Sequence, residues 1–292
     1  MKVIRAEAMG LCFGVRDALT LASNTREPES VTIHGELVHN ETVLDDLRAR
    51  GFTLTDEARR GGLPETPTVM ITAHGVSERE RGRLAAAGKH LIDTTCPLVV
   101  RVHDAARQLE ADGYNVVVIG KPGHVEVRGI VEDLAWSRVV SSPDAVECYG
   151  VARVGVVCQT TAAARDVAAI RAAIEARNPD AEIRFVDTVC QPTRDRQAAI
   201  EKLIGEVEAM VVVGGANSNN TKRLAARCRE RSLPVHHVQG ADDLDADWCA
   251  RFAVVGLTAG TSTPDATIDA VERALVSMPR VRGALHVDDR VR

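Results

Sequence analysis

The sequence has few aromatic residues and no long apolar run. Aromatic residues make up 3% of the 292 residues, whereas all apolar residues make up 45% and charged residues 26%. This balance is typical of a globular protein whose cores are built from Val, Ala, Leu and Ile. No segment approaches the roughly 20 apolar residues that cross a bilayer, and the amino terminus, MKVIRAEAMGLCFGV, lacks the apolar core of a signal peptide. We therefore expect a cytoplasmic protein with no membrane partner.

Excess basic charge and nucleotide-binding motifs are also absent. The formal net charge at pH 7 is −5, which gives no support for a nucleic-acid partner. Neither a GxGxxG fingerprint nor a Walker A motif occurs, which argues against tightly bound ATP, NAD or flavin. Any anion that the protein binds must therefore be held by a local group of side chains and backbone amides.

Apolar strands alternate with helical segments along the whole chain. Each Val- and Ile-rich run opens into a polar or Gly-rich loop, and a segment with helical periodicity follows. This pattern predicts an α/β fold with buried parallel strands covered by helices. The runs begin at Val31, Thr68, Asn115, Arg153, Met210 and Phe252.

A second pattern repeats a cysteine just ahead of a helical segment, with an arginine close behind. It reads GLCFGVRDAL at Cys12, DTTCPLVVRVHDAARQL at Cys96 and DTVCQPTRDRQAAIEKL at Cys190. These cysteines are 84 and 94 residues apart, about the length of a small α/β domain. We therefore predict three similar α/β modules, with the segment around Cys12 at their centre. The predicted boundaries are residues 1–95, 96–187 and 188–292.

The repeated position sets these three cysteines apart, because a helix start favours the thiolate form. A structural zinc site normally takes four ligands and uses C-x-x-C pairs, and no such pair occurs. A four-iron cluster held by three cysteines leaves one iron open to a substrate oxygen. A redox disulfide pair with a spare cysteine remains an alternative. We interpret the other cysteines as buried or surface residues: Cys148, Cys158, Cys228 and Cys249.

Polar side chains gather in the predicted strand-to-helix loops. His39 lies in ELVHN, His74 in TAHGVSE, and His124 in GKPGHVEVRG, where Glu126 follows two residues later. The later loops QTT, GGANSNNTK and TAGTSTP supply hydroxyls, amides and backbone N–H groups that suit phosphate oxygens. A carboxyl group beside a dry anion pocket has a raised pKa and can donate a proton. The pattern predicts an anion site, and Glu126 is either a proton donor beside it or a solvated acid of the loop.

Together these motifs resemble the 4-hydroxy-3-methylbut-2-enyl diphosphate reductase family over essentially the whole chain, from MGLCFGV to TAGTSTP. The resemblance implies a three-lobed, or trefoil, α/β protein around a central [4Fe-4S] cluster. Cys12, Cys96 and Cys190 would be its three ligands, leaving one iron site open. The implied reaction removes an allylic hydroxyl with two electrons and two protons. It yields isopentenyl and dimethylallyl diphosphates in the last step of the non-mevalonate isoprenoid pathway.

The resemblance also assigns roles to single residues. Glu126 would be the proton source, and Thr160 with His124 would orient it and the substrate hydroxyl. Many members have NSSN where this chain has NSNN, so Asn219 stands in place of a serine. No NADPH or flavin domain is visible, so the family implies an external electron donor such as ferredoxin or flavodoxin. The implied substrate ligands are His39, His74, His124, Thr160, Ser218, Asn219, Asn220 and Ser262.

Two other functions fit parts of the pattern. A cluster-containing sensor descended from the enzyme would hold iron and sulfide without turnover. A module stabilised by zinc or a disulfide would bind phosphorylated ligands and be colourless when purified. Bound iron and sulfide would distinguish the enzyme and the sensor from the module that binds phosphorylated ligands. Turnover of the allylic diphosphate would then separate the enzyme from the sensor.

Overall fold

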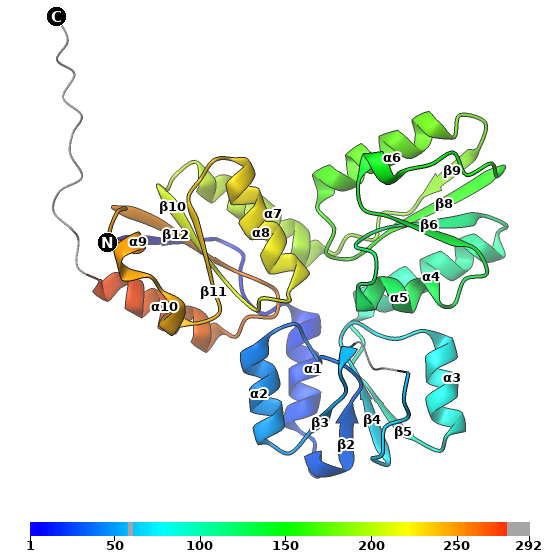
Figure 1. The fold of residues 1–292 in the computed structure, drawn as a ribbon, viewed down its shortest axis with the longest axis horizontal. Helices are drawn as coiled ribbons and strands as arrows, with labels where there is room; N and C mark the ends of the chain where they lie inside the picture. The colour runs from blue at the N-terminus through cyan, green and yellow to red at the C-terminus, as the bar shows by residue number, and fades with distance from the viewer. Residues whose placement is uncertain (58–60, 279–292) are drawn as a thin grey trace, which may run out of the picture. The chain divides into compact units, whose positions relative to one another are not determined.

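The computed structural model of the protein describes residues 1–57 and 61–278. Within these residues the strands pair in parallel and build three sheets of four strands each, with helices packed against them (Figure 1). The chain divides into two compact units, one formed by residues 12–195 and the other by residues 1–11 with the residues from 196 on. Among the helices so described, none has the length and apolar character needed to cross a membrane.

The unit of residues 12–195 begins with one module of strands and helices. Its elements are α1 (Phe13–Ser23), β2 (Val31–Ile33), α2 (Glu41–Ala49), β3 (Thr53–Leu54), β4 (Thr68–Ile71), α3 (Glu78–Ala86) and β5 (His90–Asp93). The strand order is β3-β2-β4-β5. Ala18 and Ala22 of α1 share a buried core with Ile33 and Met70, so the small side chains of α1 face this sheet.

The same unit contains a second module. Its elements are α4 (Pro97–Ala111), β6 (Asn115–Ile119), α5 (Val125–Val131), β7 (Ser137–Val140), β8 (Arg153–Cys158), α6 (Ala164–Arg177) and β9 (Glu182–Phe185). The strand order is β7-β6-β8-β9. Val116 and Val118 pack with α4 and α5, whereas Val117 and Ile119 pack with α6. This alternation buries β6 on both faces.

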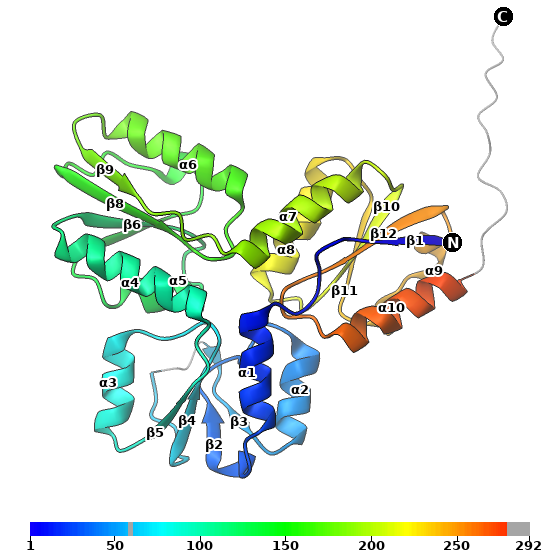
Figure 2. The ribbon, with the colours of Figure 1, turned by 180° about the vertical axis from the view of Figure 1, so that it is seen from behind.

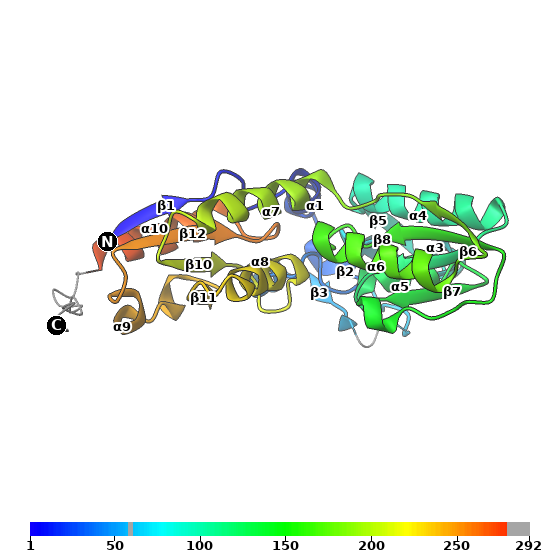
Figure 3. The ribbon, with the colours of Figure 1, turned by 90° about the horizontal axis from the view of Figure 1, so that it is seen from above.

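The other unit holds a third module. Its elements are β1 (Lys2–Arg5), α7 (Gln191–Ile204), β10 (Ala209–Val213), α8 (Asn219–Glu230), β11 (Val235–Val238), α9 (Ala246–Cys249), β12 (Val254–Ala259) and α10 (Asp265–Ser277). The strand order is β1-β12-β10-β11. Ile200 of α7 and Leu224 of α8 share a core with Met210 and Val212, so the two helices lie side by side on one face (Figure 3). Helix α10 packs in the core on the other face.

The predicted α/β class with three similar modules is confirmed. The six predicted apolar runs are β2, β4, β6, β8, β10 and β12, the inner strands of the sheets described, and each is followed by a helix. One assignment differs, because β1 was placed in the module of residues 1–95 and instead pairs with β12 (Figure 2). A four-residue strand carries no local information about which distant strand it will pair with. The module boundaries stay predictions, and residues 279–292 of the third lie outside the described residues.

Each repeated cysteine lies where the chain leaves one sheet and begins the helix that packs on another. Cys12 follows β1 and precedes α1, which packs on the sheet of β2. Cys96 follows β5 and precedes α4, which packs on the sheet of β6. Cys190 follows β9 and precedes α7, which packs on the sheet of β10. The cysteine repeat therefore marks the connections between modules.

Candidate active site

Three half-buried thiols lie at helix starts. Cys12 and Cys96 are the N-cap residues of α1 and α4, and Cys190 directly precedes α7. Burial raises the pKa of the Cys96 thiol, and burial raises the pKa of the Cys190 thiol to about 11. The charges of Cys12 and Glu126 raise both pKa values further. These four groups therefore lie within electrostatic reach of one another in the unit of residues 12–195.

The first DT-x-C sequence folds into a turn that is tied to the end of β4. The Thr94 hydroxyl donates to the carbonyl of Ile71 at 2.5 Å, and the amide of Cys96 donates to the carbonyl of Ala73 at 3.0 Å. The Asp93 carboxylate accepts from the amide two residues on at 2.9 Å. These bonds fix the position of Cys96 beside the end of the inner strand β4.

The second DT-x-C sequence repeats the turn at the end of β8. The Thr188 hydroxyl donates to the carbonyl of Cys158 at 2.6 Å, and the amide of Cys190 donates to the carbonyl of Thr160 at 3.0 Å. The Asp187 carboxylate again accepts from the amide two residues on, at 3.2 Å. The same sequence thus builds the same local structure, and each copy places a cysteine at the carboxyl end of a buried strand.

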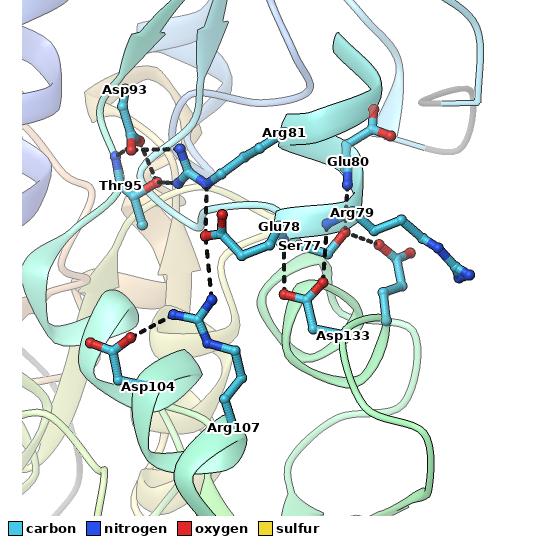
Figure 4. A network of polar contacts seen from close by, with 11 residues as sticks. Ser77, Glu78, Arg79, Glu80, Arg81, Asp93, Thr95, Asp104, Arg107 and Asp133 are labelled. Carbon is cyan, nitrogen blue, oxygen red and sulfur yellow. Dashed lines mark hydrogen bonds and ion pairs between the residues drawn. The ribbon is translucent and has the colours of Figure 1, made fainter. Parts of the chain in front are cut away.

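A charged network surrounds the first turn (Figure 4). The Arg81 guanidinium donates to the Asp93 carboxylate at 2.7 Å and to the Thr95 hydroxyl at 3.1 Å. Asp133, which follows α5, accepts from the amide of Glu78 at 2.8 Å and so caps the start of α3. The network therefore joins the two modules of this unit beside the turn that carries Cys96.

Gly14 leaves room for the thiol of Cys96. A Cβ atom at residue 14 would lie 2.4 Å from the Cys96 Sγ and 3.0 Å from its Cβ. Both separations are shorter than normal contacts, so only glycine fits without movement of the neighbour. The first turn of α1 thus packs directly against the cysteine at the start of α4. Cys12 lies two residues before Gly14, which brings the two cysteine positions into one neighbourhood.

The Glu126 carboxyl group is 1% exposed and is held by a single residue. The amide of Thr160 donates to Glu126 Oε1 at 2.7 Å, and the Thr160 hydroxyl donates to Oε2 at 2.9 Å. His124 is the N-cap of α5, and its Nδ1 accepts from the Glu126 amide at 3.2 Å. Burial raises the pKa of Glu126 to about 7, although the bonds from Thr160 and the charge of His39 oppose the rise. A large fraction of this group therefore keeps its proton at neutral pH.

Three histidines from separate loops meet in one cluster. The rings of His39 and His74 stack with centroids 4.1 Å apart and an interplanar angle of 25°. His124 presents its ring edgewise to both, at 5.3 Å from His39 and 5.8 Å from His74. His39 Nδ1 lies 2.7 Å from Glu36 Oε2, a contact that orients the ring. The cluster offers several ring nitrogens at one place, and one of its members, His124, caps the helix of Glu126.

The remaining predicted ligands lie in the other unit, at helix starts. Ser218 caps α8, since its hydroxyl accepts from the amide of Thr221 at 3.3 Å. Asn219 and Asn220 are the first residues of that helix, and Ser262 lies in the loop between β12 and α10. Asn220 Nδ2 is buried and has no hydrogen-bond partner among the described residues. An unpaired buried amide and a helix start together suit an anionic ligand.

Two residues beside the thiols were missed in the sequence. Gly14 lies against Cys96, and the Thr193 hydroxyl lies 3.1 Å from the Cys190 Sγ. The only sequence signal was their spacing, at two and three residues after a repeated cysteine. Among the described residues, no three His, Cys, Asp or Glu side chains converge as they would around a single metal ion. The assignment of Cys12, Cys96 and Cys190 as cluster ligands stays a prediction.

The fold and this site define an α/β protein with thiols and a buried acid in one unit. Known proteins are similar to this chain in sequence. A family model described as LytB protein matches residues 3–276. The 4-hydroxy-3-methylbut-2-enyl diphosphate reductase of Geobacter sp. (strain M21) is 38% identical over 277 residues, which cover 93% of this chain and 95% of that protein. The chain therefore belongs to the LytB protein family, and the resemblance seen in the sequence is confirmed.

Solved structures agree. One, described as (E)-4-hydroxy-3-methyl-but-2-enyl diphosphate reductase, the terminal enzyme of the non-mevalonate pathway, has a TM-score of 0.66 and 32% identity. The similarity covers 94% of this chain and 99% of that one. The E-1-hydroxy-2-methyl-but-2-enyl-4-diphosphate reductase of Plasmodium falciparum has a TM-score of 0.85 at 24% identity, covering 95% of this chain and 89% of that one. This second match supports the fold.

Replacing Gly14 by alanine tests the packing against Cys96. We expect Gly14→Ala to lower the free energy of unfolding of the metal-free protein by about 1–3 kcal/mol, because rotating the thiol relieves only one of the two close contacts. Gly82→Ala in α3 is the control, because a Cβ there meets nothing within 4 Å and should stabilise the helix by about 0.5–1 kcal/mol. Urea unfolding measures both, and equal stabilities would contradict the packing described.

Proposed function

We propose that this chain converts 4-hydroxy-3-methylbut-2-enyl diphosphate to isopentenyl and dimethylallyl diphosphates by reductive dehydroxylation. The observation that carries the proposal is the buried Glu126, whose two carboxyl oxygens accept from Thr160 and whose pKa is raised to about 7. An acid of this kind suits the release of a hydroxyl group as water. Membership of a family whose named relatives carry this activity supports the same conclusion.

The family is one of iron–sulfur oxidoreductases, and the donor set of this chain fits such a group. Cys12, Cys96 and Cys190 would hold a [4Fe-4S] cluster with one open iron site. Thiols at helix starts and the space that Gly14 leaves beside Cys96 support this assignment. When bound, the cluster supplies electrons and a Lewis-acidic iron. An external ferredoxin or flavodoxin would deliver the electrons, and the cytoplasmic location stays a prediction.

The Glu126 side chain supplies one of the two protons of the reaction. The substrate loses its hydroxyl and gains a hydrogen on carbon, so two electrons and two protons enter and one water leaves. Protonated Glu126 gives a proton to the departing hydroxyl, which leaves as water. Thr160 fixes both carboxyl oxygens, and His124 holds the amide of Glu126, so the acid is oriented before substrate arrives. Its burial excludes bulk water from the acid.

The diphosphate would be bound by residues that place donors at helix starts and in the histidine cluster. His39, His74 and His124 present ring nitrogens at one place. The unpaired Asn220 amide of the other unit is a further donor. Asn219, where relatives often have serine, retains a hydrogen-bond donor. The remaining proposed ligands are Thr160, Ser218 and Ser262.

The buried acid argues against the functions without turnover. A sensor needs only the cluster, and a module that binds phosphorylated ligands needs only the anion site. Neither requires a carboxyl group whose pKa is raised to about 7 by burial beside the thiols. Keeping such a group carries a cost in desolvation that catalysis explains.

Removing the acid tests its role directly. We expect Glu126→Gln to lower turnover about 10²–10⁴-fold, because an amide cannot supply the proton, while iron and sulfide content stay at the level of the unaltered protein. The control is Glu175→Gln, at an exposed ion pair with Arg171 on α6, which should leave turnover unchanged. Steady-state rates with an artificial reductant measure both. Unchanged turnover in Glu126→Gln would remove the residue from its role.

The pH dependence of turnover follows from the same pKa. Glu126 must be protonated to act, so we expect kcat to fall as pH rises through about 7. The Thr160 hydroxyl favours the carboxylate form, so Thr160→Val should raise the pKa and move the falling limb to higher pH. Rates at saturating substrate across neutral pH provide the measurement. A limb that moves to lower pH in Thr160→Val would refute the assignment.

Iron content tests the cysteine assignment. Protein purified without oxygen should be brown and hold about four irons and four sulfides per chain. We expect Cys96→Ser to lose most of this iron, because only two of the proposed ligands remain. Cys148→Ser, at an exposed cysteine far along the chain from the repeated motif, is the matched control and should retain it. Normal iron content in Cys96→Ser would exclude the three-cysteine site.

A further inference from the structure

The three cysteine helices differ in the third residue after each cysteine. This position is Val15 after Cys12, Val99 after Cys96 and Thr193 after Cys190. The structure places the Thr193 Oγ1 at 3.1 Å from the Cys190 Sγ, and Thr193 is fully buried. Valine has no polar atom to offer, so among these positions Thr193 alone has a side chain that can hydrogen-bond to a cysteine sulfur.

The backbone of the two DT-x-C turns is the same at this position. The amide of Val99 donates to the carbonyl of Cys96 at 2.8 Å, and the amide of Thr193 donates to the carbonyl of Cys190 at 3.1 Å. Val99 is also buried, at 4% exposed. The two sites share this backbone hydrogen bond, and at this position only the second carries a hydroxyl, which makes Val99 a reference for Thr193.

The direction of the bond depends on the state of the sulfur. In the structure the Cys190 thiol donates to the Thr193 hydroxyl. A cysteine that binds iron has lost its proton, so the hydroxyl must turn and become the donor. Among the described residues the Thr193 hydroxyl has no other hydrogen-bond partner that would hold its proton elsewhere. The hydroxyl is thus placed to donate to a Cys190 thiolate.

We propose that Thr193 sets the reduction potential of the bound iron–sulfur group by donating a hydrogen bond to the Cys190 sulfur. The inference rests on the proposed function, because it requires Cys190 to be a ligand. Adding an electron makes the group more negative, and a donor to its sulfur stabilises the reduced form more than the oxidised form. Thr193 acts through Cys190, so it is a positioning residue.

The sulfur that Thr193 contacts belongs to the cysteine tied to the proton donor. The Cys190 amide donates to the carbonyl of Thr160, whose amide and hydroxyl hold Glu126. Thr193 is thus linked with the acid through Cys190 and Thr160. The residues that would adjust the reduction potential of the cluster and the residue that would supply the proton are therefore linked through the loop that follows β8.

A redox titration of three variants tests the proposal. We expect Thr193→Val to lower the equilibrium constant for one-electron reduction of the cluster about tenfold, because the reduced form loses more stabilisation than the oxidised form when a hydrogen bond to a charged group is removed. For one electron this corresponds to a midpoint potential about 59 mV lower. Thr193→Ser keeps the hydroxyl and should keep the potential. Val99→Thr adds a donor beside Cys96 and should raise the potential.

The iron content and the midpoint potential together distinguish a failure of this proposal from a failure of the proposed function. An unaltered protein that holds no iron and sulfide would contradict the proposed function. A Thr193→Val protein with full iron content and an unchanged potential would overturn the role of Thr193 and leave the reductase activity standing. If Thr193→Val does not retain its cluster, Val99→Thr decides, and an unchanged or lowered potential there overturns the proposal.

Discussion

The backbone and side chain of Thr160 join the buried acid Glu126 to Cys190. Its carbonyl accepts from Cys190, and its amide and hydroxyl donate to Glu126. Because Thr160 lies two residues after the end of β8, a strand buried on both faces, these bonds start from a rigid point. The orientation of the Glu126 carboxyl group and the position of Cys190 both depend on this one residue, which also limits the rise in the Glu126 pKa that burial causes.

The inner strands could be read from the sequence, and the edge strands could not. A strand such as β6 is buried on both faces, so it appears as a continuous apolar run. Edge strands face solvent on one side and carry charge, as in HLID at β5 and EIRF at β9, so they do not stand out from loops. The pairing of β1 with β12 could not be predicted from any local pattern, because the paired residues are 252 positions apart in the sequence.

The sequence predicted which residue types belong to the candidate site, but it did not predict the contacts between them. Repetition pointed to the three cysteines, and shared loop positions pointed to His39, His74 and His124, which the structure brings together. Gly14 and Thr193 were missed because glycine and threonine are ordinary residues in a helix turn, and only their distances to sulfur give them meaning. The burial that raises the pKa of Glu126 likewise depends on residues from several elements.

The pairing of β1 with β12 has a consequence for how the protein is made. Lys2–Arg5 pairs with Val254–Leu257, so strands from opposite ends of the chain form one edge of a sheet. During synthesis the amino-terminal strand leaves the ribosome first, and more than two hundred residues must follow before its neighbour exists. Such a pairing is slow to form because the intervening chain must first close a long loop. Completion of this sheet therefore waits until the chain has been translated past Leu257.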